Sequence, residues 1–418
     1  MGKKAKYYWS LILVFCVIAT GCGNSNGGQA TKVTPTVETV TSEVTPTEAV
    51  PTVDAVTGTP TPTKYVDRLP DQTLKDRYDG IFRIGVALPR SEFAKINHME
   101  LVKEQFNSFT YENEMKPDAL LIQQYSHDGL PDTYKEPVLN LQSLDTGLSF
   151  AQKNGFGMRG HTLCWYSQTP KWFFTEDYTN NGALVSKEVM LARLESYIKQ
   201  VMTYCQDNYP GVIYAWDVVN EAVDSGTGDA QGIRMVNNKW YEVIGPDFIQ
   251  YAFQFARKYS DGSAGLYYND YGCAGKKETI VNVLQPIKDA GNIDGIGMQC
   301  HISTSDLVEN VVYKTAKYFA DNGYKVEITE LDMENKIAGE SGEKKQARKY
   351  KLLFQLMEQA KLNGEIDIDS ITVWGLYDSI SWKSSDKPLL FRARLNDLEK
   401  KYAWYGAIQD DEIQASEW

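Results

Sequence analysis

From about Tyr65 onward, short runs of apolar residues alternate along the chain with longer amphipathic segments. Short apolar runs bounded by turn residues predict buried strands, whereas apolar residues at three- and four-residue spacing predict helices. We expect eight strands, at Phe82–Leu88, Ser108–Thr110, Gly157–Trp165, Tyr214–Glu221, Gly265–Asp270, Gly295–His301, Lys325–Asp332 and Ile371–Asp378. Helical spacing is clearest in Met190–Tyr204, Asp247–Tyr259 and Glu343–Lys361. This alternation predicts an α/β domain whose parallel strands are buried on both faces.

Polar and ionisable residues gather at the carboxyl ends of six of the predicted strands. They are His161 and Trp165, Asn220 and Glu221, Asn269 and Asp270, Gln299 and His301, Glu330 and Asp332, and Trp374 and Asp378. Alternation alone fits an open doubly wound sheet as well as a closed barrel. In a barrel, however, all carboxyl ends meet at one face, where barrel active sites are built. We therefore predict a (β/α)8 TIM barrel that forms a single catalytic domain over residues 67–418.

The first 22 residues have the pattern of an export signal. Three lysines among the first six residues precede a short apolar run, Trp9–Ala19. That run falls short of the about 20 apolar residues that span a bilayer. Small residues then lead to Cys22, a pattern that resembles a bacterial lipoprotein signal, in which the cysteine is lipidated after cleavage. We expect residues 1–22 to be a signal peptide with a lipobox, with an ordinary secretory signal as the alternative.

Residues 23–66 are rich in Thr, Pro and Val and lack any apolar period that could build a core. This composition is typical of an extended, disordered linker. Together with lipidation at Cys22, it predicts an exported protein that is anchored to the membrane at the cell surface. If the signal is an ordinary one, the protein is secreted instead.

Charge and composition narrow the classes of ligand. The chain has 43 Lys and Arg against 55 Asp and Glu, so its formal net charge is −12. An acidic chain repels phosphate backbones, which argues against a nucleic-acid partner. With only 4 His and 6 Cys, a Cys/His zinc framework is hard to build. We expect neither a metal nor a cofactor.

Two other patterns have plain structural explanations. Gly155, Gly157 and Gly160 spell the G-x-G-x-x-G motif of dinucleotide sites, but a predicted helix precedes it and a strand follows it. A dinucleotide site needs the reverse order, so we reject this interpretation. Export would permit a disulfide, but three of the four cysteines in the predicted domain lie in or just after barrel strands, so buried free thiols are expected instead. The four are Cys164, Cys205, Cys273 and Cys300.

Two glutamates follow apolar segments at strand ends, Glu221 on the fourth strand and Glu330 on the seventh. A pair of carboxyl groups at one site can provide the proton transfer and the nucleophile that cleave a glycosidic bond. We expect Glu221 to be the proton donor, kept protonated by partly apolar surroundings and a neighbouring anion. Glu330 lies within reach of His301, which would keep it ionised. Asp332 projects to the same side of the strand and would orient His301.

Seven segments in order resemble family 10 glycoside hydrolases, the endo-β-1,4-xylanases. WDVVNEA (Trp216–Ala222) and ITELD (Ile328–Asp332) resemble that family's acid/base and nucleophile segments. The others resemble its second, third, fifth, sixth and eighth strand segments, at Phe106–Asp118, Gly160–Trp172, Tyr267–Tyr271, Gly295–His301 and Thr372–Trp382. The resemblance runs from about Leu74 to Ile408. Three positions depart from the usual family pattern, Pro117, Tyr166 and Lys383, where Trp, His and Arg are frequent.

The resemblance implies roles for individual residues. It makes Glu221 the general acid/base, Glu330 the nucleophile and Asn220 the donor to the sugar 2-hydroxyl, with His301 and Asp332 supporting the nucleophile. Substrate-binding roles are implied for Glu112, Asn113, Lys116, His161, Trp165, Gln168, Gln299, Trp374 and Trp382. Trp382 matches the residue that favours xylose over glucose by crowding a C6 hydroxymethyl group.

The implied function is endo-acting hydrolysis of internal β-1,4-xylosidic bonds by double displacement with retention, for degradation of plant cell-wall polysaccharide. The implied partners of a monomeric enzyme are xylan and xylo-oligosaccharides, with membrane contact only through the lipid anchor. One rival is a cellulase or another retaining β-glycanase, which relative activity on xylan and cellulose would distinguish. A second rival is a lipid-anchored sugar-binding protein, which has no need for two glutamates at strand ends.

Overall fold

The computed structural model describes residues 72–123, 136–395 and 397–409. The predicted signal peptide at 1–22, including Cys22, lies outside the described residues, as does the predicted linker at 23–66. Both therefore stay predictions. In the part of the chain that is described, no helix is long and apolar enough to cross a bilayer.

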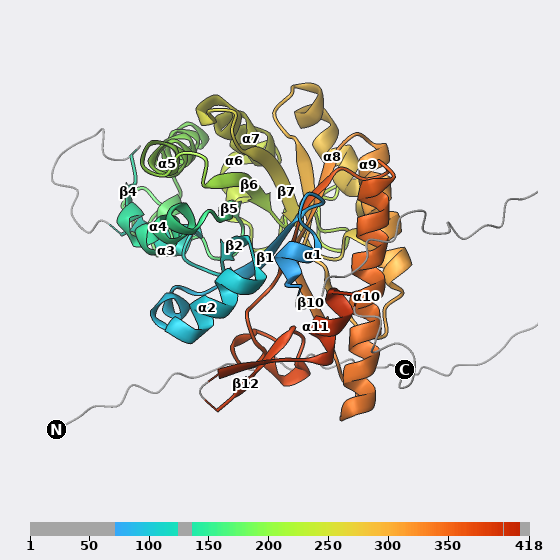
Figure 1. The fold of residues 1–418 in the computed structure, drawn as a ribbon. Helices are drawn as coiled ribbons and strands as arrows, with labels where there is room; N and C mark the ends of the chain where they lie inside the picture. Colours follow the sequence, from blue (N-terminus) through green and yellow to red (C-terminus); the bar gives the residue numbers. More distant parts are fainter. Residues whose placement is uncertain (1–71, 124–135, 396, 410–418) are drawn as a thin grey trace, which may run out of the picture. The chain divides into compact units, whose positions relative to one another are not determined.

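Eight parallel strands close into a barrel (Figure 1). The ring closes where β11 pairs with both β1 and β10. The barrel strands are β1 (Arg83–Leu88), β2 (Ser108–Tyr111), β5 (Gly157–Trp165), β6 (Ile213–Asn220), β7 (Gly265–Asp270), β8 (Gly295–Met298), β10 (Lys325–Glu334) and β11 (Ile368–Val373). Each predicted strand has its counterpart here, and closure of the ring confirms the (β/α)8 barrel over the open sheet.

Shorter strands add to this framework. β9 (His301–Ser303) pairs in parallel with the far end of β10. Two antiparallel pairs lie outside the barrel, β3 (Leu121–Ile122) with β4 (Val138–Leu139), and β12 (Phe391–Arg394) with β13 (Asp397–Lys400).

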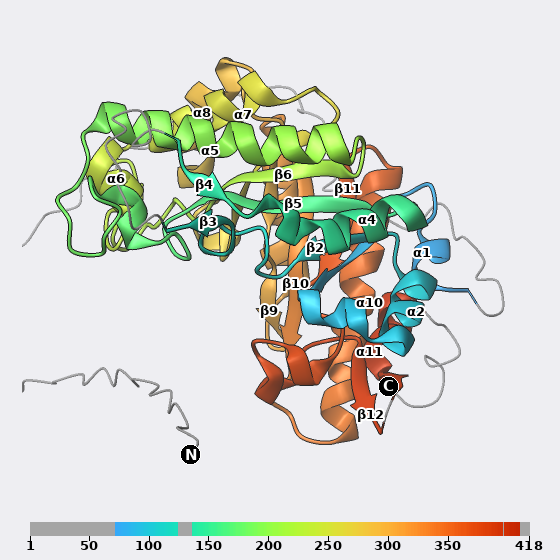
Figure 2. The same ribbon diagram turned by 90° about the vertical axis from the view of Figure 1, so that its left-hand side faces the viewer.

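Helices surround the barrel and bury their apolar sides against it (Figure 1). They are α1 (Leu74–Arg77), α2 (Ile96–Gln105), α3 (Pro117–Leu120), α4 (Asp145–Asn154), α5 (Lys187–Asn208), α6 (Lys239–Ile244), α7 (Phe248–Tyr259), α8 (Lys277–Asp289), α9 (Lys314–Asp321), α10 (Glu340–Leu362) and α11 (Tyr402–Ala407). Figure 2 shows α5 lengthwise along the outside of β6. The Ser186 hydroxyl caps this helix by accepting from the Val189 amide, and Pro210 disfavours helical backbone at Tyr209.

Two predicted strands end earlier than the apolar pattern suggests. β8 stops at Met298, and Cys300 takes a left-handed conformation with φ of 59° before β9 begins at His301. The last barrel strand is Ile368–Val373, so Trp374 and Asp378 lie in the connection that follows it. Apolar residues continue past both strand ends because the turns are themselves buried, which periodicity cannot separate from a strand.

The cysteine and glycine interpretations are confirmed. Cys164, Cys205, Cys273 and Cys300 are free and buried. Gly155 ends α4 with φ of 69°, where a residue with a Cβ is strained. A Cβ at Gly160 would lie 2.2 Å from the Trp216 ring, so this glycine allows close packing between β5 and β6.

Candidate active site

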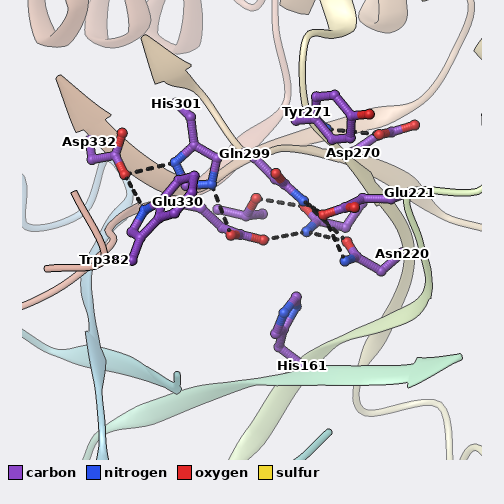
Figure 3. Close-up of polar contacts among 12 residues, drawn as sticks. His161, Asn220, Glu221, Asp270, Tyr271, Gln299, His301, Glu330, Asp332 and Trp382 are labelled. Atoms are coloured by element: carbon purple, nitrogen blue, oxygen red, sulfur yellow. Dashed lines mark hydrogen bonds and ion pairs between the residues drawn. The ribbon is translucent and has the colours of Figure 1, made fainter. Parts of the chain in front are cut away.

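The predicted site residues converge at the carboxyl ends of the barrel strands (Figure 3). β5, β6, β7 and β10 each contribute polar side chains, as does the connection between β8 and β9. Glu221 and Glu330 belong to one hydrogen-bonded cluster, although they are more than one hundred residues apart in the sequence. The barrel therefore brings the two predicted carboxyl groups to a single site.

Glu221 lies just past the end of β6 rather than within it. Its backbone is left-handed, with φ of 57°, and its amide donates to the Asn269 carbonyl at 2.9 Å. A left-handed conformation is uncommon for a residue with a side chain and marks a specially held position. Here it redirects the side chain from the strand end into the site.

Three N–H groups donate to the Glu221 carboxyl. Trp165 Nε1 donates to Oε2 at 3.1 Å. Gln299 Nε2 and Asn220 Nδ2 donate to Oε1 at 2.9 and 3.3 Å. The sequence predicts a partly apolar site for Glu221. In the structure, N–H donors from three different strand ends gather around the carboxyl group itself.

Glu330 is buried within β10, which continues to Glu334 instead of ending at the glutamate. Asn269 Nδ2 donates to Oε1 at 2.8 Å, and His301 Nε2 lies 3.2 Å from Oε2. Burial would raise the pKa of Glu330, but the His301 hydrogen bond and the charges of His161, His301 and Lys116 lower it below its usual value. Glu330 is thus held as an acceptor-only carboxylate.

His301 joins Glu330 to Asp332, as the sequence predicts. Its Nδ1 lies 2.8 Å from Asp332 Oδ2. Burial lowers the pKa of His301, but the hydrogen bonds to Asp332 and Glu330 outweigh it and raise the pKa to about 9. Both ring nitrogens therefore carry protons at neutral pH and both donate. Asp332 also accepts from Trp382 Nε1 at 2.8 Å, and Trp382 itself is 59% exposed.

A second group of predicted residues surrounds Lys116, which precedes α3. Its Nζ donates to Asn113 Oδ1 and Gln168 Oε1, each at 3.0 Å, and lies 5.0 Å from the centre of the Trp165 ring. Burial lowers the pKa of Lys116. Burial also raises the pKa of Glu112, although Lys116 opposes this change. Lys116 places a buried cation close to Trp165, which itself donates to Glu221.

His161 and Trp374 also lie at the site. Their rings pack edge to face, with centres 5.4 Å apart. His161 Nδ1 lies 3.0 Å from Asp217 Oδ2, in the interior of the barrel. Asp217 is bound through both carboxylate oxygens by Arg159, at 2.8 Å each. Burial would raise the pKa of Asp217, but Arg159 and His161 lower it.

The sequence reasoning assigned no site role to Asn269, Asp217 or Arg159. Asn269 donates to both Asn220 and Glu330, and Asn220 in turn donates to Glu221. Asn269 therefore connects the surroundings of the two glutamates. Its place at a strand end was the signal that could have found it. Arg159 lies two residues before His161 on β5, so the strand period places both side chains on one face. Only closure of the barrel shows what Arg159 contacts.

Comparisons with known proteins agree with this architecture. The family model described as glycosyl hydrolase family 10 matches residues 73–410. Endo-1,4-beta-xylanase B of Butyrivibrio fibrisolvens is 41% identical over 351 residues, which cover 81% of this chain and 54% of that protein. Endo-1,4-beta-xylanase A of Thermotoga maritima is 38% identical over 346 residues, covering 80% of this chain and 30% of that protein. The chain thus spans about half, or less, of the length of these curated relatives.

Solved structures share the fold. The N-terminal CBM22-1–GH10 modules of a Clostridium thermocellum endo-1,4-beta-D-xylanase, complexed with xylohexaose, match with a TM-score of 0.73 and 34% identity, covering 81% of this chain and 67% of that one. An intracellular xylanase of Thermoanaerobacterium saccharolyticum, as a mutant with xylotriose, gives 0.69 and 32%, covering 81% and 98%. From the family match and these similarities together, the chain belongs to glycosyl hydrolase family 10.

Proposed function

We propose that this protein is an endo-1,4-β-xylanase that cleaves internal bonds of xylan with retention of anomeric configuration. One observation carries the proposal. Two glutamates meet in one hydrogen-bonded cluster at the carboxyl face of the barrel, and their surroundings differ. Curated relatives named as endo-1,4-beta-xylanases support the choice of substrate, as do related structures that hold xylo-oligosaccharides.

In this mechanism Glu330 is the nucleophile. It is anionic, buried and aimed by two donors, Asn269 and His301. Its carboxylate attacks the anomeric carbon and forms a glycosyl-enzyme, while the Glu221 carboxyl protonates the departing oxygen. Water then attacks the same carbon, with Glu221 as the base that takes its proton. Trp165 and Gln299 hold the Glu221 carboxyl in place through both steps.

The remaining predicted residues bind the sugar chain or support the glutamates. Asn220 lies beside Glu221, and its proposed role is to donate to the sugar 2-hydroxyl. Asp332 keeps His301 oriented toward Glu330. The substrate-binding set is Glu112, Asn113, Lys116, His161, Trp165, Gln168, Gln299, Trp374 and Trp382. The exposed Trp382 would disfavour a C6 hydroxymethyl group, and so cellulose.

Product release from glucuronoxylan and from a soluble cellulose tests this proposal. We expect rapid formation of short xylo-oligosaccharides, weak action on cellulose and retention in the first product measured by NMR. Glu330→Ala should abolish turnover, and Glu221→Ala should lower it by about 10²–10⁴-fold on xylan. Glu309→Ala, which removes an exposed carboxylate outside the site, is the matched control.

Other outcomes would select a rival. Tight binding of xylan without product release would favour a sugar-binding protein. Faster release from cellulose would favour another β-glycanase and remove the role given to Trp382. Inversion of configuration would contradict the assignment of Glu330 as a nucleophile.

We also propose that the protein is exported, is lipidated at Cys22 and acts as a monomer at the cell surface in the degradation of plant cell-wall polysaccharide. The lysine-rich start, short apolar run and small residues before Cys22 support this location. Radiolabelled palmitate should enter the full chain expressed in a bacterium, and Cys22→Ser should remove the label. Unlabelled protein in the medium would indicate ordinary secretion, and light scattering checks the monomer.

A further inference from the structure

The chain that follows Glu221 folds back on itself. We call residues 222–234 the return loop. Val223 and Ile233 form an antiparallel bridge, and the Arg234 amide donates to the Ala222 carbonyl at 2.8 Å. The loop therefore brings Arg234 back beside Glu221, thirteen residues later in the sequence.

The Arg234 side chain is buried and uses each of its nitrogens. Nε donates to the Glu221 carbonyl oxygen at 3.0 Å. Nη1 pairs with Asp224 Oδ2 at 2.9 Å, and Nη2 donates to Tyr271 Oη at 2.9 Å. The guanidinium carbon also lies 4.2 Å from the centre of the Tyr166 ring. A planar guanidinium held by three acceptors and one ring has little freedom to move.

The Glu221 backbone is held from both sides. Its amide donates to Asn269 on β7, and its carbonyl accepts from Arg234 on the return loop. Tyr271, which anchors Arg234, lies near Glu221 on the opposite side of the site from His301 (Figure 3). Because Glu221 has φ of 57°, loss of either contact allows its backbone to relax toward a more common conformation.

We propose that Arg234 is a positioning residue that aims the Glu221 carboxyl by holding the left-handed backbone of Glu221. This inference rests on the proposed function, because it assigns Arg234 a part in proton transfer. Arg234 contacts the main chain of Glu221 and not its carboxyl group. It therefore affects the direction in which the Glu221 side chain points. General acid catalysis requires hydrogen-bond reach between the acid and the departing oxygen, and small displacements cost large factors in rate.

Substrates with different leaving groups separate this role from a general loss of structure. In an aryl xylobioside made from an acidic phenol, the phenolate leaves without being protonated. The sugar leaving group of xylotetraose, by contrast, must be protonated by an acid. We expect Arg234→Met to lower kcat/KM by about 10–100-fold for xylotetraose and by less than about threefold for the aryl xylobioside, since only the former uses the general acid.

Azide gives an independent readout of the second step. Azide attacks the anomeric carbon of the glycosyl-enzyme, the bond from that carbon to Glu330 breaks, and the Glu330 carboxylate leaves without any proton transfer. Azide should therefore raise kcat of Arg234→Met on the aryl xylobioside and yield xylobiosyl azide. Wild-type enzyme should not respond in this way, because its base already activates water.

Arg257→Met is the matched control, since it removes an arginine paired with Asp294 on another part of the barrel. It should affect both substrates equally and show no azide effect. Equal losses on both substrates for Arg234→Met, or no loss on either, would overturn the inference. If Arg234→Met does not fold, Arg234→Lys, which cannot reach all three acceptors, gives the same comparison with the same two overturning results.

Glu221→Ala separates this inference from the proposed function. Its kcat/KM should fall much more for xylotetraose than for the aryl xylobioside, and azide should raise its kcat on the aryl xylobioside. If it shows neither, Glu221 is not the acid/base and the proposed function fails. If Glu221→Ala shows both while Arg234→Met behaves like Arg257→Met, only the role of Arg234 is wrong.

Discussion

At the scale of single residues, the positive charge of His301 is stabilised by two neighbouring carboxylates. His301 lies between these carboxylates, Glu330 and Asp332, and donates to both. The same contacts that aim Glu330 also stabilise the imidazolium. His301 therefore links the ionisation of the proposed nucleophile to the stability of the fold.

The pH dependence of unfolding tests this link. A pKa raised in the folded state, here to about 9, adds stability that is fully present below the unfolded value of about 6.5. That stability is lost as pH rises through about 9. We compare the free energy of unfolding of the wild type with that of His301→Gln. The advantage of the wild type should be larger at pH 6 than at pH 9.5, by at most about 3 kcal/mol. Urea unfolding at both values checks this, and an unchanged difference would contradict it.

At the scale of elements, β7, β8 and β10 pack together around Asn269. Asn269 accepts from the Thr329 hydroxyl at 2.6 Å and donates to Glu330 at 2.8 Å. Gly297 lies opposite Asn269 in the pairing of β7 with β8. A Cβ at Gly297 would lie 2.5 Å from Asn269 Oδ1. The glycine is needed because it leaves room for the Asn269 amide, which holds the proposed nucleophile Glu330.

We expect Gly297→Ala to lower kcat on xylan by about 10–100-fold, because the displaced Asn269 amide no longer aims Glu330. Gly275→Ala is the control, since a Cβ at Gly275 meets no atom within 4 Å. Steady-state kinetics and thermal unfolding of both variants check the effect. Wild-type kcat in Gly297→Ala would show that Asn269 tolerates the shift.

At the scale of the whole molecule, charged side chains cross the interior of the barrel. Arg159 on β5 binds Asp217 on β6 through two hydrogen bonds and Glu327 on β10 at 2.6 Å. Ser370 on β11 donates to the same Glu327 oxygen at 2.8 Å. This network joins strands that lie on different sides of the ring, so its integrity depends on closure of the whole barrel.

Removing the central cation should destabilise the barrel strongly. Arg159→Met leaves two carboxylates buried without their cation, which costs about 3–5 kcal/mol. Arg392→Met breaks a partly exposed pair with Glu343, and it should cost about 0–1 kcal/mol. Denaturant unfolding compares the two variants. A loss below about 1 kcal/mol for Arg159→Met would mean that water or rearrangement compensates the carboxylates.

Local patterns in the sequence were sufficient for the strand order and for much of the site. Buried parallel strands are short apolar runs, and their polar ends stand next to them in the chain. The contacts of His301 with Glu330 and Asp332 were predicted in this way. The same patterns identified Glu221 as a candidate site residue but included it in the strand, whereas β6 ends at Asn220. The turn after β6 is as buried as the strand, so the apolar pattern does not mark the strand end.

The sequence by itself thus determined the elements, the two glutamates and the family. Tertiary structure alone decided the left-handed backbone of Glu221, the polar groups around its carboxyl and the contacts of Arg159 and Arg234. The physical reason is that a hydrophobic period reports which face of one element is buried. Hydrogen-bond partners in the site lie on different elements, and those elements become neighbours only when the barrel closes.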